Sequence, residues 1–338
     1  MFKTHLAAII GRTDLSQSQM AQMMTDVFDG QTTDAQVGAM MAALATKGET
    51  VEELSGAARA MRQKAYRIQV AATPVVDTCG TGGDGLKTFN ISTTTAFVVA
   101  GCGVTVAKHG NRSVSSQCGS ADVLECLGVK LDTDPEVVEE AVREIGVGFL
   151  YAPLYHSAMR HAARARKEVG LPSIFNLLGP LTNPAGAHCQ LLGVFAPQLT
   201  EMFAQALRLL GAHSAFVVHG HDGLDELSVC APSRVSQLEN DQIRTYDISP
   251  EPFFGRLAAP EALTGGDPER NAAITRAILG GEPGPRRDVV LLNAAAALVA
   301  CRQALDLQAG IHLAAGAIDS GAAMAKLEAL IQYTQDNG

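Results

Sequence analysis

The segment VVDTCGTGGDG, from Val75 to Gly85, joins a short apolar run to a cluster of glycines. The apolar pair at its start predicts a short buried strand. Four glycines within residues 80–85 allow the backbone to turn through positive φ and to approach a ligand without an intervening Cβ. This order of elements predicts a strand that delivers a glycine loop to one edge of a sheet.

The segments that follow the glycine loop add groups that favour anions. An apolar run at residues 96–100 predicts a helix, and the sequence NIST at residues 90–93 lies at its N-terminus. Free N–H groups and the helix dipole make such a terminus an anion site. A second apolar run at residues 104–107 leads into KHGNR at residues 108–112. Strand, glycine loop, helix, strand and basic loop together predict a phosphate-binding cradle.

The glycine spacing excludes two common phosphate sites. The segment contains neither the G-x-x-x-x-G-K-[ST] pattern of a P-loop nor the G-x-G-x-x-G pattern of a dinucleotide fold. The glycines alone would be read as an ordinary turn. The combination of glycines, helix N-terminus and basic loop between Asp77 and Ser120 favours a binding site instead.

Length, composition and charge limit the class of protein. A chain of 338 residues with 47% hydrophobic residues is long enough for two domains with a substantial core. No apolar run approaches the ~20 residues of a membrane span, and no signal peptide is evident. Seven scattered cysteines fit reduced thiols in a cytoplasmic protein. The net charge of −9 opposes affinity for nucleic acid or acidic membranes, so we expect neither partner.

Residues 1–70 predict a small helical domain. Apolar residues recur at helical spacing within residues 20–28, 37–44 and 54–61. The methionines among them are typical of a core or a subunit interface rather than of a cofactor site. The segment at residues 71–74 then connects this domain to a larger one, residues 71–338.

From Val75 onward, strands and helices alternate, which predicts an α/β domain with a mostly parallel sheet. The predicted strands are residues 75–78, 104–107, 149–152, 191–195, 215–219, 227–230, 235–239 and 243–246. The predicted helices are residues 92–101, 121–127, 135–145, 154–168 and 199–210. Residues 250–266 predict an irregular connection, and the remaining chain predicts three helices.

Seven sequence blocks, spread over nearly the whole chain, resemble the anthranilate phosphoribosyltransferase family. The blocks are GTGGD at 80–84, NIST at 90–93, KHGNR at 108–112, GSAD at 119–122, IFNLLGPLTNP at 174–184, HGHDGLDE at 219–226 and NAAA at 293–296. The resemblance implies an α/β fold of the nucleoside phosphorylase/phosphoribosyltransferase type. It also implies that a segment around residues 160–184 returns to the helical domain, and that this domain forms a homodimer.

The resemblance implies transfer of the phosphoribosyl group of 5-phosphoribosyl 1-pyrophosphate to the amine of anthranilate, with release of pyrophosphate, in tryptophan biosynthesis. The implied phosphoribosyl pyrophosphate site comprises Gly80, Gly83, Asp84, Thr88, Asn90, Ile91, Ser92, Thr93, Lys108, His109, Gly110, Asn111, Arg112, Ser113, Val114, Ser115, Ser116 and Ser120. No dedicated catalytic base is expected, because the reaction depends on positioning and on stabilisation of charge.

The adjacent carboxylates Asp225 and Glu226 are the candidate metal ligands. Two carboxylates in a loop are ordinarily solvated surface groups, and on that basis we expect them to be exposed. Beside a phosphate cradle they also match the usual ligands of Mg²⁺, which are one or two carboxylates together with substrate phosphates. The resemblance assigns Mg²⁺ to these two side chains and to the hydroxyl of Ser92.

Anthranilate is assigned by resemblance to four residues, namely Gly80, Asn111, His156 and Arg166. A guanidinium suits a planar carboxylate, although Arg166 lies among other basic residues and could be solvated charge. His156 could equally be a hydrogen-bonded buried histidine. Two segments depart from the family pattern, namely Gln117-Cys118 and Leu171-Pro172-Ser173.

Two other functions remain open at this stage. A pyrimidine nucleoside phosphorylase would share the two-domain architecture but would not need the Asp225-Glu226 pair. A non-catalytic nucleic-acid-binding member of the superfamily would be at odds with the net charge of −9.

Overall fold

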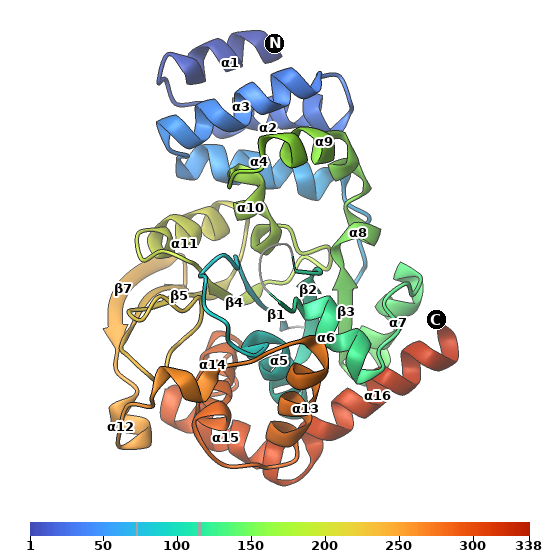
Figure 1. Cartoon of the computed structure of the whole chain (residues 1–338), viewed down its shortest axis with the longest axis vertical. Helices are drawn as coiled ribbons and strands as arrows, with labels where there is room; N and C mark the ends of the chain where they lie inside the picture. The colour runs from blue at the N-terminus through green and yellow to red at the C-terminus, as the bar shows by residue number, and fades with distance from the viewer. Residues whose placement is uncertain (72–73, 114–116) are drawn as a thin grey trace.

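The structure, a computed structural model, describes residues 1–71, 74–113 and 117–338. A bundle of helices stands above a larger α/β unit (Figure 1). The first four helices are α1 (Phe2–Ile10), α2 (Gln17–Phe28), α3 (Asp34–Lys47) and α4 (Val51–Lys64). Two later helices, α9 (Arg160–Val169) and α10 (Ile174–Leu178), pack against α2, α3 and α4.

Capping side chains fix where the bundle helices begin. Ser16, Thr33 and Thr50 each form a capping box with the residue three positions later. The capping carboxylate of α4, Glu53, is fully buried and also accepts hydrogen bonds from the N–H of Leu15 and from Lys47. It therefore joins the loop between α1 and α2 to α4.

The larger unit is built on one seven-stranded sheet with the order β3-β2-β1-β4-β5-β6-β7. The strands are β1 (Val75–Gly80), β2 (Thr105–Gly110), β3 (Val147–Tyr151), β4 (Cys189–Gly193), β5 (Ser214–Gly220), β6 (Ser233–Glu239) and β7 (Gln242–Ile248). Neighbouring strands from β3 to β5 are parallel, and β6 and β7 are antiparallel additions. The predicted mostly parallel sheet is confirmed.

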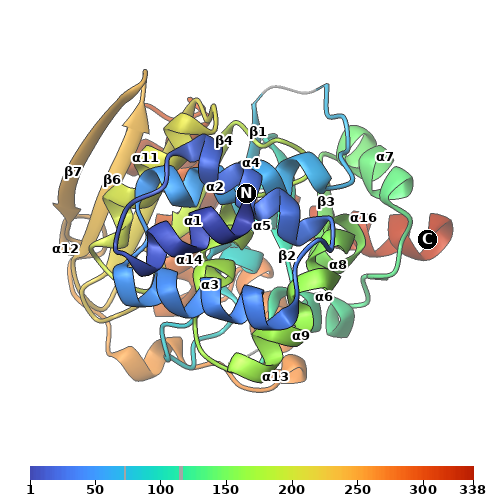
Figure 2. The same ribbon diagram turned by 90° about the horizontal axis from the view of Figure 1, so that it is seen from above.

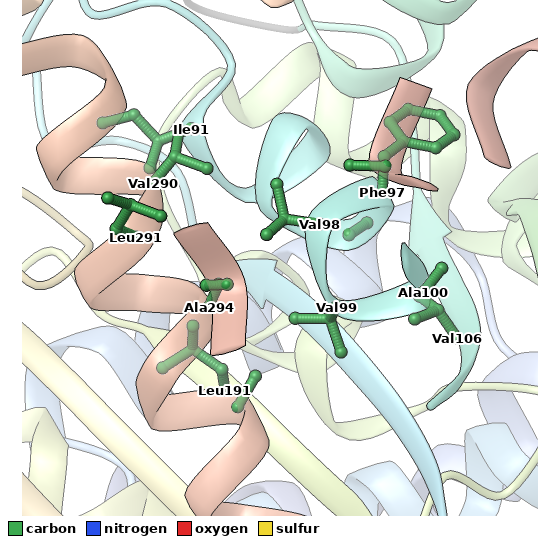
Figure 3. Packing of buried hydrophobic residues seen from close by; sticks show 14 of the residues in the cluster. Ile91, Phe97, Val98, Val99, Ala100, Val106, Leu191, Val290, Leu291 and Ala294 are labelled. Carbon is green, nitrogen blue, oxygen red and sulfur yellow. The ribbon is translucent and has the colours of Figure 1, made fainter. Parts of the chain in front are cut away.

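Helices cover both faces of the sheet. Consecutive residues of β4 show the alternation, because Leu191 packs in the cluster around α5 (Ile91–Gly101) and Leu192 packs toward the helical bundle. Figure 3 shows Val98 and Val99 of α5 beside residues of α14 (Pro285–Ala300), with Leu191 beneath them. The N-terminus of α5 is therefore held on a fully packed apolar support.

The remaining elements surround this core. They are α6 (Ser120–Leu127), α7 (Pro135–Ile145), α8 (Ala152–Tyr155), η1 (Ser157–Met159), η2 (Gly179–Leu181), α11 (Leu199–Leu209), α12 (Glu251–Phe254), η3 (Pro260–Leu263), α13 (Pro268–Leu279), α15 (Leu307–Asp319) and α16 (Ala322–Asn337). Figure 2 shows β6 and β7 at one edge of the molecule and α7 with α16 at the opposite edge. No helix in the described parts of the chain is both long and apolar enough to cross a membrane.

Three secondary-structure predictions are wrong. The single helix predicted at 154–168 is broken, because His156 leaves the helical region with φ −114° and ψ 51°. Residues 227–230 are irregular and bent rather than a strand. The C-terminal part contains four helices instead of three, since the apolar spacing continues across short turns at residues 301–306 and 320–321.

Candidate active site

The glycine loop lies directly against the second acidic block. Gly82 donates its backbone N–H to Asp225 Oδ2 over 2.9 Å, and both Gly82 and Gly83 have positive φ (63° and 82°). A side chain at either position would be strained. The loop and the carboxylate, which are more than a hundred residues apart in sequence, thus lie in direct contact.

Two paired glycines make room for Asp225. Gly80 and Gly193 face each other across β1 and β4 at the end of the parallel strands. A Cβ added to Gly193 would lie 1.5 Å from the carbonyl oxygen of Asp225, and one added to Gly80 would lie 2.5 Å from its Oδ2. Gly193 was not predicted as a site residue. The only signal in the sequence is that Gly193 ends an apolar strand, as Gly80 does in β1.

The carboxylates of this site are not exposed, so the prediction of a solvated loop pair is wrong. Glu226 is only 6% exposed, and its Oε2 is buried without a hydrogen-bond partner among the described residues. Burial, with the charge of Asp225 next, raises the pKa of Glu226 well above its ordinary value. Burial, with the charge of Asp84 next, raises the pKa of Asp225 to about 8. A cation beside these two carboxylates would offset the cost of their burial.

Lys108 is a buried cation whose charge acts on Glu226. Its side chain is 3% exposed, donates to the carbonyl oxygen of Thr78 and lies 3.4 Å from the hydroxyl of Ser92. Burial lowers the pKa of Lys108, and the charges of Asp77, Cys79 and Glu226 oppose that shift.

The donor set fits Mg²⁺ with substrate oxygens completing its shell. Asp225, Glu226 and the nearby Ser92 carry oxygen atoms of the kind that Mg²⁺ binds. Within the described residues, no three His, Cys, Asp or Glu side chains gather into a complete metal-binding group. Mg²⁺ is usually held by one or two carboxylates together with substrate phosphates, so an incomplete protein set is the expected arrangement.

The N-terminus of α5 carries the predicted NIST block. Asn90 occupies the N-cap position, but its side chain makes no capping bond. Ile91 is buried in the core, and its N–H donates to the carbonyl of Phe89. Ser92 is partly exposed, and Thr93 is buried with an unpartnered hydroxyl among the described residues. The side chains of Asn90 and Ser92 are thus the accessible ones in this block.

The basic loop is less positive than its sequence suggests. Arg112 is bound by Asp122 at 3.0 Å and by Glu125 at 2.8 Å, and it lies over the ring of Tyr151. The structure therefore does not direct Arg112 into the cradle. Asn111 is exposed, and its backbone carbonyl accepts from Ser120 Oγ.

The other predicted residues of the cradle are placed as follows. Thr88 forms an isolated bridge with Thr264, Asp84 accepts from the N–H of Leu86, Ser113 donates its N–H to Asp122, and Gly110 has no room for a Cβ beside Ser120 Oγ. The predicted contacts at Val114, Ser115 and Ser116 lie outside the described residues.

Two buried histidines are in contact above β2. Nε2 of His156 lies 3.2 Å from Nε2 of His109, and Nδ1 of His109 lies 3.2 Å from the carbonyl oxygen of Gly179. A carbonyl can only accept, so His109 carries its proton on Nδ1 and His156 donates from Nε2. Burial lowers the pKa of His109 to about 3 and that of His156 to about 4. Both imidazoles are neutral at physiological pH.

Sequence reasoning missed the support beneath these histidines. The buried carboxylate of Asp77 accepts from the backbone N–H of His109 at 3.1 Å and from Asn183 Nδ2 at 2.8 Å. Asn183 also donates to the carbonyl of Ala107. Both residues lie in quoted sequence blocks, so each could have been suspected, but their partnership spans 106 positions.

The lowered histidine pKa values predict acid sensitivity. Because the pKa of His156 falls from about 6.5 in the unfolded chain to about 4 in the fold, its contribution is present above pH ~6.5 and is lost as pH falls toward 4. Between pH 7 and pH 4.5, we expect the free energy of unfolding to fall by about 2–4 kcal/mol less in His156→Gln than in the wild type. Urea unfolding at the two pH values would measure this difference. The exposed His312→Gln variant should follow the wild type. An identical pH dependence in all three proteins would contradict the burial argument.

Arg166 is half-buried on α9 and lies 5.4 Å from the ring centroid of Phe175. Burial lowers its pKa, and within the described residues no acidic side chain pairs with it. Its neighbour Arg164 is instead paired with Glu168 and Asp34. Arg160, at the start of the helix, is exposed and contacts His161, so Arg166 is the half-buried arginine of this helix without an acidic partner among the described residues.

The two departures from the family pattern leave the local structure intact. Gly170 ends α9 in a left-handed conformation, and at the start of α10 the backbone N–H of Ser173 donates to Asn176 Oδ1 over 3.1 Å. Leu171 between them is exposed. Gln117 is exposed, whereas Cys118 is buried and donates to Asn90 Oδ1 at 3.3 Å.

Family models and individual relatives agree on what this chain resembles. Residues 72–324 match the model of the glycosyl transferase family a/b domain, and residues 3–65 match that of its helical bundle domain. Anthranilate phosphoribosyltransferases from Syntrophobacter fumaroxidans and Desulfosudis oleivorans are 67% and 68% identical to it, each match covering 100% of both chains.

Solved structures give the same result. The crystal structure of anthranilate phosphoribosyltransferase from Thermus thermophilus superposes with a TM-score of 0.92 at 42% identity, covering 98% of this chain and 99% of that one. The Saccharomyces cerevisiae enzyme in complex with PRPP and Mg superposes with a TM-score of 0.90 at 26% identity, covering 99% and 98%. This chain belongs to the anthranilate phosphoribosyltransferase family.

Proposed function

We propose that this protein transfers the phosphoribosyl group of 5-phosphoribosyl 1-pyrophosphate to the amine of anthranilate, releasing pyrophosphate, as a step of tryptophan biosynthesis in the cytoplasm. The observation that carries the proposal is the Asp225-Glu226 pair, in which half-buried Asp225 is held against the glycine loop and buried Glu226 has a carboxylate oxygen without a partner among the described residues. Family membership disfavours both the nucleoside phosphorylase and the nucleic-acid-binding alternative.

The chain's own groups suit this reaction without a catalytic base. The reaction breaks a bond between ribose and pyrophosphate through an oxocarbenium-like transition state, so positive groups must face the departing phosphates. We assign this role to Lys108, to the N-terminus of α5 and to the glycine-loop N–H groups. Mg²⁺ bound at Asp225, Glu226 and Ser92 would supply further positive charge to the pyrophosphate oxygens.

The acceptor side has a different character. His109 and His156 are neutral at physiological pH, and Arg166 is a cation without an acidic partner among the described residues. We assign the anthranilate carboxylate to Arg166 and the contacts nearer its amine to Gly80, Asn111 and His156. These groups would hold the weakly basic amine against C1 of the ribose, which lowers the barrier by orientation.

The fluorescence of anthranilate tests the function directly. We expect it to fall when phosphoribosyl pyrophosphate and Mg²⁺ are added to the protein, and we expect a chelator of divalent cations to stop the change. Folded protein that leaves the fluorescence constant at every Mg²⁺ concentration would refute the proposal. Continued transfer after complete chelation would refute only the role of Mg²⁺.

Arg166→Ala should raise the KM for anthranilate without changing the KM for phosphoribosyl pyrophosphate. Loss of a charge-assisted hydrogen bond costs about 1.5–3 kcal/mol, so the KM for anthranilate should rise about ten- to a hundredfold. The KM for phosphoribosyl pyrophosphate should hardly change. Arg164→Ala, on the same helix but paired with Glu168, is the matched control and should keep both constants. Equal rises in both KM values would assign the carboxylate to another residue.

We also propose that the helical bundle, residues 1–70 with the returning segment around 160–184, is the smaller domain beside residues 71–338, and that it carries a homodimer interface. Support comes from apolar side chains that remain exposed on it, namely Met1, Ile10 and Leu171. Sedimentation at micromolar concentration, with Ile10→Glu as the disrupting variant, would test the interface. A wild-type monomer would contradict it.

A further inference from the structure

A chain of hydrogen bonds joins the cradle to helix α13, far from it in sequence. Nδ2 of Asn271, in the first turns of α13, donates to Oδ1 of Asn90 over 3.0 Å. Asn271 Oδ1 accepts from the backbone N–H of Gly266 over 2.8 Å, and Asn90 Nδ2 donates to the carbonyl of Cys118 over 3.2 Å. Asn271 is 1% exposed, so its amide is fully enclosed by these partners.

The two ends of this chain fix its direction. The N–H of Gly266 can only donate, so the oxygen of the Asn271 amide must face it. The nitrogen of that amide then faces Asn90 and requires an oxygen there. The carbonyl of Cys118 can only accept, which demands the nitrogen of Asn90 on the other side. Both amides therefore have a single orientation that satisfies every partner.

Among the described residues, this orientation leaves one hydrogen on Asn90 Nδ2 without an acceptor. An amide nitrogen carries two hydrogens, and the carbonyl of Cys118 uses one. Asn90 is partly exposed at the N-terminus of α5, where backbone N–H groups already favour anions. The hydrogen bonds from Asn271 to Asn90 thus leave Asn90 with a donor, rather than an acceptor, at the point where a phosphate would lie.

The segment before α13 also braces the loop that leads to Asn90. Gly265 donates its N–H to the carbonyl of Lys87 at 2.8 Å, and Phe89 donates to the carbonyl of Leu263 at 3.2 Å. A Cβ on Gly265 would lie 2.6 Å from both the backbone nitrogen of Phe89 and the side-chain oxygen of Asn271. The two backbones are in direct contact, so a shift of one is transmitted to the other.

We propose that Asn271 is a positioning residue of the phosphoribosyl pyrophosphate site, which orients the amide of Asn90 so that it donates to the substrate. The inference rests on the proposed function and adds a residue from another part of the chain to its site. Asn271 does not touch the substrate. It acts through Asn90, and its effect belongs to the phosphate substrate alone.

The decisive variant is Asn271→Ala, compared with Thr275→Val. Thr275 lies one turn further along α13 and makes an equivalent buried contact, to Thr94 one turn further along α5, at 3.0 Å. We expect Asn271→Ala to raise the KM for phosphoribosyl pyrophosphate about five- to tenfold, as for the loss of one oriented hydrogen bond, with the anthranilate KM within about twofold of wild type. Thr275→Val should lower the melting temperature about as much as Asn271→Ala does, but should leave both KM values unchanged.

A double-variant cycle tests whether Asn271 acts through Asn90. If it does, Asn90→Ala/Asn271→Ala should raise the KM for phosphoribosyl pyrophosphate no further than Asn90→Ala alone. Additive increases would overturn the inference, as would an Asn271→Ala enzyme with the wild-type constant. Should Asn271→Ala fail to fold, Asn271→Asp retains the acceptor for Gly266 and enters the same cycle. A wild-type protein without transfer activity would instead refute the proposed function, so the two failures are distinguishable.

Discussion

Glu226→Gln should abolish most of the activity while making the metal-free protein more stable. The variant keeps the shape of the side chain but removes a buried charge whose Oε2 has no partner among the described residues. Loss of one preorganised electrostatic group commonly lowers kcat by about 10²–10³-fold. The amide removes the cost of ionising a buried carboxyl, which thermal unfolding in a chelator at neutral pH would register as a rise in Tm.

The pH dependence of this stability has a defined sign. Burial raises the pKa values of Asp225 and Glu226 in the fold, so their favourable contribution is complete below pH ~4 and is lost as pH rises through the folded values, about 8 for Asp225. In a chelator, the Tm of the wild type should therefore fall between pH 5 and pH 8 more than that of Glu226→Gln. Added Mg²⁺ should raise the wild-type Tm at pH 8 and hardly affect the variant.

Asp222→Asn supplies the matched control for this prediction. Asp222 lies in the same loop, and its carboxylate accepts from Ser228 Oγ at 2.6 Å, a bond that an asparagine oxygen can also accept. This variant should keep its activity and its response to Mg²⁺. Glu226→Gln enzyme that remained active at limiting Mg²⁺, or that gained as much stability from Mg²⁺ as the wild type, would show that the metal lies elsewhere.

The burial of these carboxylates explains where the sequence prediction stopped. The order of strands and helices follows from local apolar spacing, and it predicted the parallel strands and α5 closely. The neighbours of Glu226 come from distant segments, including Lys108 and the backbone of Ser92. An adjacent Asp-Glu pair in a loop carries no local signal that the fold will enclose it.

Arg112 has side-chain partners that the sequence prediction did not anticipate. In sequence it adds positive charge to the loop at residues 108–112, and it was therefore predicted to bind phosphate. In the structure its guanidinium is occupied by Asp122 and Glu125 of α6, only ten and thirteen positions away. The GSAD block was recognised, but a pairing between two blocks depends on how the chain returns, which spacing alone does not determine.

Gly193 shows a third kind of information that only packing reveals, because there is no room for a side chain at its position. It has an ordinary strand conformation, so no turn requires a glycine there. The requirement comes from the backbone of Asp225, which passes 1.5 Å from the place of a Cβ. Sequence patterns predicted the strand and missed the constraint.

Gly193→Ala should therefore disable the site from a position that contributes no functional group. The new methyl group must displace the Asp225-Glu226 segment by about an ångström or more, since a contact of 1.5 Å cannot exist. A misplacement of about 1 Å can cost about a hundredfold in rate, and we expect kcat to fall by at least that factor together with the response to Mg²⁺.

Gly316→Ala is the appropriate comparison for this last prediction. Gly316 lies inside α15, and a Cβ there meets nothing within 4 Å. Alanine is more favourable than glycine within a helix by about 1 kcal/mol, so this variant should be fully active with an equal or higher Tm. Circular dichroism would show whether Gly193→Ala retains its fold. A folded Gly193→Ala enzyme with wild-type kcat and Mg²⁺ dependence would mean that the close approach of the acidic segment to β4 is not needed for activity.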